Sequence, residues 1–289
     1  MPETPLPLFL RHPRVWRENR FVYPVVSRRS GGISIGVNLN PDKVCNFDCI
    51  YCQVDRRSEA ETRFVKLDAV LQELDQVLTL VETGALFEDE SFRKVPEPLR
   101  RLNDIAFSGD GEPTTYRNFD EIVERVVAVK RAHGRDDVKL VLITNASMFH
   151  RPVVQRGLEI LDRNNGEIWA KLDAGTDAYY QLIERTRIPF RQVLDNIAAA
   201  ARVRPLVLQS LFMRVNGEPP SADEIEAFCD RLREIRTSGG QIRLVQIYTV
   251  ARPPAESFVT PLTREELDAI ARCVDERTQL PTAVFPGAA

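Results

Sequence analysis

Short apolar runs of β-strand length alternate along this chain with longer segments that have a helical period. This alternation is typical of βα units, in which a helix connects two parallel strands. The runs expected to form strands are residues 33–38, 104–108, 138–144, 167–172, 206–215 and 242–250. Six strand-helix units are too few for an eight-stranded barrel. Their number predicts either a partial barrel or a doubly wound sheet.

The segments between these strands have the apolar spacing of amphipathic helices. They are residues 67–81, 119–132, 153–161, 191–203 and 222–235. Ser221 stands where a helix N-cap belongs, and Asp223 stands in the first turn that follows. The proline-containing stretch 86–101 is expected to be an insertion.

The length and apolar content of the chain are enough for one large core domain. Of its 289 residues, 43% are apolar and 28% are charged. We expect a lead-in over 1–32, a barrel over 33–250, and a C-terminal helix and tail over 251–289 that pack on the barrel. The N-terminal apolar run is too short for a signal peptide, and no run reaches about 18 apolar residues. A cytoplasmic protein with no membrane partner is therefore predicted.

The charged side chains are nearly balanced. The net charge of -3 comes from 39 basic and 42 acidic residues, and no segment is strongly basic. Charge therefore does not support a nucleic-acid partner. The chain has five cysteines, an odd number, and three of them are crowded together, which suits a metal site better than a disulfide framework.

Cys45, Cys49 and Cys52 follow the first expected strand with the spacing C-x3-C-x2-C. A short loop with this spacing can hold three corners of a four-iron cluster, which leaves one iron without a protein ligand. A structural zinc site normally has four ligands, and the three histidines of the chain are scattered. The alternatives are a zinc knuckle or three unrelated core cysteines.

Tyr51 precedes the last of these cysteines, and the whole motif resembles the signature of the radical S-adenosylmethionine (SAM) superfamily. The resemblance extends over residues 33–250. It is strongest to the wyosine-base-synthase-like branch of iron-sulfur oxidoreductases, through the segments GDGEPTTY, LVLITNAS and AKLDAGTD. These segments end the second, third and fourth expected strands. The resemblance implies an α/β fold, a partial (βα)6 TIM barrel.

The resemblance also implies a cofactor set and a reaction. One 4Fe-4S cluster would be held by Cys45, Cys49 and Cys52, and SAM would chelate its open iron. Reductive cleavage would give methionine and a 5'-deoxyadenosyl radical that abstracts hydrogen from an unidentified substrate. Flavodoxin or ferredoxin would supply the electron, because the chain has no second redox motif. Cys229 and Cys273 stand alone, so no auxiliary cluster is expected.

Gly109, Asp110, Gly111 and Glu112 follow the second expected strand and resemble the Gly-Gly-Glu element of the family. Glycines allow a close backbone approach, and acidic oxygens can accept hydrogen bonds from the methionyl ammonium of SAM. The sequence differs from the family by its Gly-Asp-Gly-Glu order. The alternative is a turn placed before Pro113 for backbone reasons.

Three further residues are expected in the cofactor site, together with the aromatic Tyr51. Asn145 follows the third strand, where its alternative role is a cap. Lys171 and Asp173 end the fourth strand and share one face, because side chains alternate along a strand. They would pair with the methionyl carboxylate and the ribose hydroxyls of SAM. The alternative is a buried ion pair with a structural role.

Two other functions remain open at this point. The first is tRNA base modification, suggested by the wyosine-like branch, although the balanced charge and the lack of cysteines before Cys45 count against it. The second is a noncatalytic iron-sulfur sensor or electron carrier. Several polar loops that converge on an open iron argue for an enzyme instead.

Overall fold

The computed structural model of the chain describes residues 16–56, 59–60 and 65–287. The chain forms two compact units. The first consists of residues 1–45, 58–143 and 151–167, and the second consists of 46–57, 144–150 and 168–289. Residues 1–15 of the expected lead-in and 288–289 of the expected tail lie outside the described residues.

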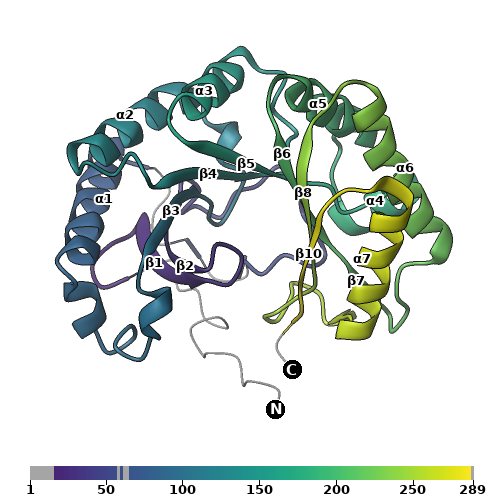
Figure 1. The fold of residues 1–289 in the computed structure, drawn as a ribbon, viewed down its shortest axis with the longest axis horizontal. Coiled ribbons are helices and arrows are strands. Elements are labelled where there is room, and N and C mark those ends of the chain that lie inside the picture. Colours follow the sequence, from purple (N-terminus) through teal and green to yellow (C-terminus); the bar gives the residue numbers. More distant parts are fainter. Residues whose placement is uncertain (1–15, 57–58, 61–64, 288–289) are drawn as a thin grey trace. The chain divides into compact units, whose positions relative to one another are not determined.

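The first unit contains four neighbouring strands, in the order β1 (Val22–Ser27), β2 (Gly32–Val37), β3 (Leu102–Phe107) and β4 (Lys139–Thr144). Strand β1 is antiparallel to β2, whereas β2, β3 and β4 are parallel. The helices are α1 (Leu67–Glu82), α2 (Phe119–Ala132) and α3 (Pro152–Asp162), and they lie along one side of these strands (Figure 1). Every residue of β2 is buried, as expected for a strand covered on both faces.

The second unit has parallel strands of its own: most of β5 (Gly166–Lys171), followed by β6 (Leu206–Leu211), β8 (Ile242–Tyr248) and β10 (Thr282–Phe285). Its helices are α4 (Asp177–Glu184), α5 (Phe190–Val203), α6 (Ala222–Thr237) and α7 (Arg264–Thr278). A separate antiparallel pair joins β7 (Met213–Val215) to β9 (Val259–Pro261). Because parallel strands end at a common edge, the loops that follow them carry the side chains of a site.

The expected helices and strands are present, and their boundaries agree to within two residues, with one exception. The run 206–215 is not one strand. It leaves the parallel sheet after Leu211 and resumes as β7, and the buried Phe212 lies between the two parts. The stretch 86–101 contains the short 3-10 helices η2 (Ala85–Glu88) and η3 (Glu97–Leu99).

The predicted lead-in and tail both contain strands. Strand β1 lies within 1–32, and α7 and β10 lie within 251–289. The division into three domains stays a prediction. No helix among the described residues is both long enough and apolar enough to span a membrane.

Candidate cofactor site

The loop that carries Cys49 and Cys52 lies in the second unit, against the end of α4. The last carbonyl groups of a helix have no partner within the helix. Here the carbonyl oxygens of Ile183 and Glu184 accept hydrogen bonds from the backbone N–H groups of Ile50 (2.9 Å) and Asp48 (3.1 Å). The cysteine loop therefore caps the C-terminus of α4, which fixes the backbone of residues 48–50.

The side chain of Glu184 also contacts this loop. The Cys49 thiol donates a hydrogen bond to Glu184 Oε2 at 2.7 Å, and the Tyr51 hydroxyl lies 2.8 Å from Glu184 Oε1. Burial, with Asp173 nearby, raises the pKa of Glu184 to about 8. Burial and the neighbouring Glu184 raise the pKa of Cys49 well above its ordinary value. Both groups are therefore mainly protonated at neutral pH.

Asp173 connects this pair to Lys171. The Tyr51 hydroxyl donates to Asp173 Oδ2 at 2.6 Å, and Lys171 Nζ lies 2.9 Å from the same oxygen. Lys171 Nζ also donates to the hydroxyl of Tyr248 at 2.9 Å and lies 4.9 Å from the centre of the Tyr51 ring. Burial alone would lower the pKa of Lys171, but Asp173 and Tyr248 outweigh it and raise that pKa. The ammonium and the Asp173 carboxylate thus form a buried ion pair.

Asn145 lies in the same unit and contacts the start of the loop. Its amide Nδ2 donates to Asn46 Oδ1 at 2.8 Å, and its Oδ1 accepts a hydrogen bond from the backbone N–H of Ser147 at 3.1 Å. The second bond is a local turn of the kind that Asn often makes. A small cavity of about 10 Å³ adjoins these groups, which is room for about one water molecule. Its lining includes Phe47, Asn145, Lys171, Asp173, Tyr180 and Glu184.

The Gly-Asp-Gly-Glu segment lies in the first unit, against residues 38–44. A Cβ atom on Gly109 would come within 2.2 Å of Asn38 Oδ1, and one on Gly111 would come within 2.2 Å of the Val44 carbonyl oxygen. Glycine is therefore required at both positions for a close approach of the chain to itself. Asn38 Nδ2 donates to Asp110 Oδ2 at 2.7 Å, which fixes the segment that leads to Cys45.

Glu112 has a local structural role at the start of η4 (Pro113–Thr115). Its carboxylate accepts a hydrogen bond from the backbone N–H of Thr114 at 3.1 Å and caps this short helix. The chain bends over residues 109–111, and η4 begins at Pro113. Cofactor binding by Glu112 stays a prediction, as it does for the other expected site residues.

The three cysteines are half-buried residues, Cys45 in the first unit and Cys49 and Cys52 in the second. Thiols are the ligands that iron-sulfur clusters take, so the chemistry of the donor set fits a cluster. Over the part of the chain that the structure describes, no group of three or more His, Cys, Asp and Glu side chains is arranged to hold a metal ion.

Glu184 is the site residue that the sequence analysis missed. Its helix is only eight residues long, and the apolar period over so short a segment is a weak signal. A signal was present nonetheless. Thr176 is an N-cap residue, and Glu184 follows Tyr180 by four positions, which places an acidic side chain on the buried face of a helix that begins at Asp177.

Comparison with known proteins gives one family match. Residues 39–232 match the family model described as the Radical SAM superfamily. The chain is 27% identical over 255 residues to a UPF0026 protein of Helicobacter pylori, which covers 86% of this chain and 71% of that protein. It is 24% identical to a protein of Brachyspira hyodysenteriae named GTPase Obg, of which it spans 35%.

Two solved structures share the fold. A radical SAM methyltransferase from Sphaerobacter thermophilus has a TM-score of 0.62 at 14% identity, over 91% of this chain and 68% of that chain. A structure of TYW1 with a lysine-pyruvate adduct bound has a TM-score of 0.50 at 16% identity, over 86% of this chain and 74% of that chain. At these identities the likeness shows the fold alone, and it confirms the expected α/β partial barrel.

Proposed function

Because the chain belongs to the radical SAM superfamily, we propose that it is an enzyme that cleaves SAM reductively at a single 4Fe-4S cluster held by Cys45, Cys49 and Cys52. The family generally uses such a cluster together with SAM. The observation that carries the proposal is the C-x3-C-x2-C motif within the matched residues 39–232. Cys45, Cys49 and Cys52 would hold the cluster, which when bound would supply the electron for cleavage of SAM to methionine and a 5'-deoxyadenosyl radical that abstracts hydrogen from an unidentified substrate.

The polar residues expected at the site are of the kinds that suit a charged cofactor. Asp173 and Lys171 present a carboxylate and an ammonium beside the cavity, for the ribose hydroxyls and the methionyl carboxylate of SAM. Tyr51 is held by Asp173 and Glu184, so its ring has one fixed orientation. Gly109, Asp110, Gly111 and Glu112 would receive the methionyl ammonium, and Asn145 would contact the methionyl or ribose part.

Lys171 is suited to pairing with a negatively charged group and not to forming a covalent adduct. A lysine that forms an adduct with a carbonyl compound must lose its proton, which a lowered pKa favours. The pKa of Lys171 is raised by Asp173 and Tyr248. The raised pKa of Lys171 thus favours a charged ammonium over the neutral amine that adduct formation requires.

The test is anaerobic reconstitution with iron and sulfide, followed by reduction with dithionite or a flavodoxin system. With SAM, the wild-type protein should release 5'-deoxyadenosine and methionine, measured by liquid chromatography and mass spectrometry. Cys49→Ala should release neither, while Cys273→Ala, a change in α7, should match the wild type. Air should stop the reaction, because an iron without a protein ligand is open to oxidation.

The nucleoside product of the reaction distinguishes the proposed cleavage of SAM from the alternatives. Methylthioadenosine in place of 5'-deoxyadenosine would mean that a different carbon-sulfur bond of SAM is broken. If the cluster assembled and SAM bound but neither nucleoside formed, a noncatalytic sensor or electron carrier would be the better reading. The electron donor, flavodoxin or ferredoxin, is identified by which of the two supports turnover.

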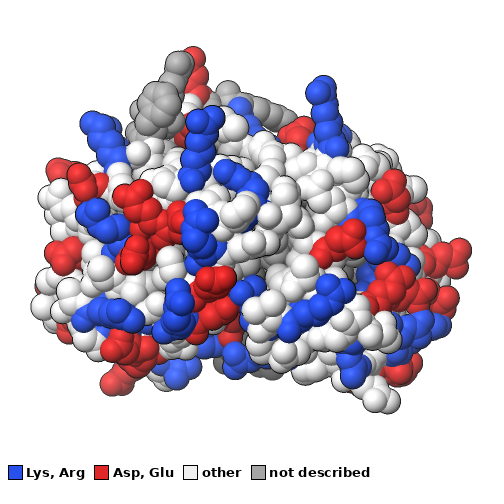
Figure 2. Space-filling view, turned by 90° about the horizontal axis from the view of Figure 1, so that it is seen from above, with Lys and Arg blue, Asp and Glu red and all other residues white. Residues whose placement is uncertain are grey.

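The second candidate is a tRNA base-modifying, wyosine-synthase-like enzyme, favoured by the likeness in fold to the TYW1 structure. Charge does not favour it. Basic and acidic side chains are interspersed on the face drawn in Figure 2, in keeping with the net charge of -3. Binding of bulk tRNA in about 0.15 M salt, with an affinity that falls as salt increases, would support this candidate.

A further inference from the structure

We propose that Glu184 is a positioning residue of the cysteine loop, whose carboxyl group holds Cys49 and Tyr51 in place before iron is bound. The inference rests on the proposed function, because it concerns the loop assigned to the cluster. Glu184 would act through these two residues and would not ligate iron itself.

Glu184 contacts the loop through both its backbone and its side chain. Its carbonyl oxygen accepts a hydrogen bond from Asp48 N, its Oε2 accepts one from the Cys49 thiol, and its Oε1 lies 2.8 Å from the Tyr51 hydroxyl. With Ile183, whose carbonyl oxygen accepts a hydrogen bond from Ile50 N, it contacts four consecutive loop residues. Its side chain reaches them from the interior, since Glu184 is only 3% exposed.

The end of α4 is shaped for this contact. Arg185 adopts a left-handed backbone conformation with a φ of 45°, which ends the helix at Glu184. Thr186 then donates a hydrogen bond from Oγ1 to the Asn46 carbonyl oxygen at 3.0 Å. Ile183, Glu184 and Thr186 thus bind the loop from Asn46 to Tyr51, and the carboxyl of Glu184 provides the side-chain contact with a cysteine.

A carboxyl group at this position is not required for packing alone. An apolar side chain of similar size could pack at position 184, but it would offer no hydrogen-bond acceptor to the Cys49 thiol. A buried polar group without a partner costs free energy. The Cys49 thiol would then turn toward another partner. The proposal therefore concerns the direction in which Cys49 points, which its chemical accessibility reports directly.

The experiment uses the cluster-free full-length protein under reducing, anaerobic conditions. Iodoacetamide alkylation is followed for each cysteine by peptide mass spectrometry, with Cys273 as the internal reference. In Glu184→Ala, Cys49 should react about three- to tenfold faster than in the wild type, the factor that one lost hydrogen bond corresponds to. Leu182→Gln, an exposed position on the same helix, should leave the Cys49 rate unchanged.

Two conservative variants keep the test decisive if Glu184→Ala does not fold. Glu184→Asp retains the carboxyl group but withdraws it from the loop, so Cys49 should again react faster. Glu184→Gln retains the length and an acceptor oxygen, and should restore a rate close to that of the wild type. Circular dichroism melts identify the variants that are folded.

The outcomes separate this inference from the proposed function. Wild-type rates at Cys49 in folded Glu184→Ala or Glu184→Asp would overturn the positioning role, whether or not the wild type takes up iron. A wild-type protein that takes up no iron would contradict the proposed function, which the alkylation rates do not test. If the positioning role and the proposed function are both correct, iron uptake during reconstitution should also be slower in Glu184→Asp than in Leu182→Gln.

Discussion

Asp173 has no exposed side-chain surface, and three elements depend on its carboxylate. It accepts hydrogen bonds from the Tyr51 hydroxyl and the Leu211 backbone N–H, both at 2.6 Å, and it pairs with Lys171. A buried charge that has lost its partner is costly. The ion pair is therefore part of the framework of the second unit, whatever it binds in addition.

We predict that Asp173→Ala lowers the free energy of unfolding by about 3–5 kcal/mol, because the Lys171 ammonium is left buried without its carboxylate. Denaturant unfolding followed by circular dichroism measures this change. The matched control is Asp195→Ala, which breaks an exposed ion pair with Arg191 and should cost no more than about 1 kcal/mol. Similar losses in the two variants would show that the Lys171–Asp173 pair does not behave as a buried pair.

The residues of the site were predictable where strand alternation decides which side chains share a face. Lys171 and Asp173 were expected on one face, and they form an ion pair at 2.9 Å. Glu184 was missed, because its importance arises from the fold of a short helix against a loop 135 positions earlier in the chain. Sequence spacing carries no information about such a distant contact.

At the scale of elements, helix α6 anchors the loop that follows β5. The buried carboxylate of Glu224, in the first turn of α6, accepts hydrogen bonds from the Gly175 backbone N–H at 2.5 Å and the Thr176 hydroxyl at 2.6 Å. A Cβ atom on Gly175 would come within 2.1 Å of the Phe228 backbone nitrogen. Loop and helix are thus in direct backbone contact, next to Asp173.

Glu224→Ala should therefore lower the free energy of unfolding by about 2–3 kcal/mol, since it leaves buried donors of the loop without an acceptor. The comparison is Glu226→Ala on the same helix, an exposed position paired with Arg277, which should cost at most about 1 kcal/mol. Urea unfolding curves of both variants give the two values. Equal, small losses would mean that water replaces the carboxylate at Gly175 and Thr176.

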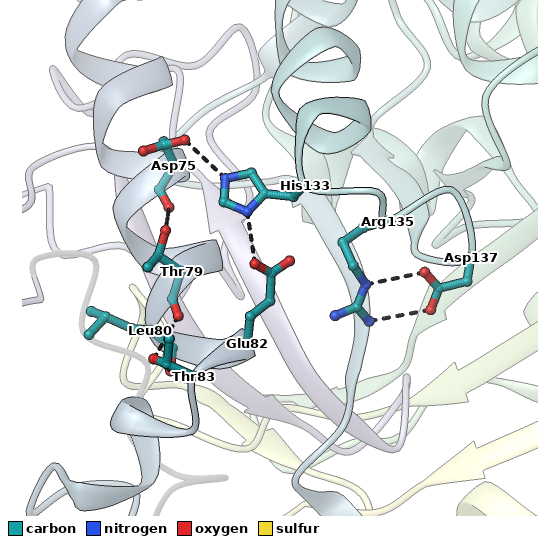
Figure 3. A network of polar contacts seen from close by, with 8 residues as sticks. All are labelled: Asp75, Thr79, Leu80, Glu82, Thr83, His133, Arg135 and Asp137. Carbon is teal, nitrogen blue, oxygen red and sulfur yellow. Dashed lines mark hydrogen bonds and ion pairs between the residues drawn. The ribbon is translucent and has the colours of Figure 1, made fainter.

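Helices α1 and α2 are joined through His133, the C-cap residue of α2 (Figure 3). Its Nδ1 lies 2.9 Å from Glu82 Oε2 and its Nε2 lies 2.9 Å from Asp75 Oδ1. Both carboxylates accept, so both ring nitrogens must carry hydrogen, which requires the charged imidazolium. Partial burial would lower the pKa of His133, but the bonds to Glu82 and Asp75 outweigh it and raise that pKa.

A raised pKa in the folded protein stabilises it below the unfolded pKa of about 6.5, and this contribution is lost as the pH rises through the folded pKa. We predict that His133→Asn costs about 0.5–1 kcal/mol at pH 6 and close to nothing at pH 9. Urea unfolding at both values measures the difference. The control is Arg135→Gln, which breaks the adjacent ion pair with Asp137 in Figure 3. It should change the free energy of unfolding equally at pH 6 and pH 9, because Arg stays charged at both.

The elements themselves were predictable wherever a regular period lasts for more than about ten residues, as in α2, whose expected and observed boundaries coincide. Strand β1 was missed because Pro24 interrupts its pattern, and proline is tolerated there only on a strand that lies at an edge. The division of 206–215 was missed because apolar residues continue through Phe212, while the change of partner from β8 to β9 is a tertiary event.

At the scale of the whole molecule, the number of iron-sulfur clusters that the chain can hold depends on which of its cysteine thiols can bind iron. A thiol must lose its proton to bind iron, and a buried thiol resists this. Cys229 on α6 is fully buried, and burial raises its pKa to about 12. Its thiol lies 3.9 Å from the Cys273 carbonyl oxygen on α7. These two cysteines pack between α6 and α7, where Cys229 is buried and Cys273 is half-buried.

We therefore predict one cluster, with about four irons and four sulfides per chain after anaerobic reconstitution, measured by metal analysis and the visible absorption spectrum. Cys45→Ala, Cys49→Ala and Cys52→Ala should each abolish assembly, because each removes one of three ligands. Cys229→Ala and Cys273→Ala are the matched controls and should retain the full iron content. About eight irons per chain would require ligands beyond this loop, and tetrahedral zinc in its place would mean that the C-x3-C-x2-C segment is a structural site with a fourth ligand from elsewhere.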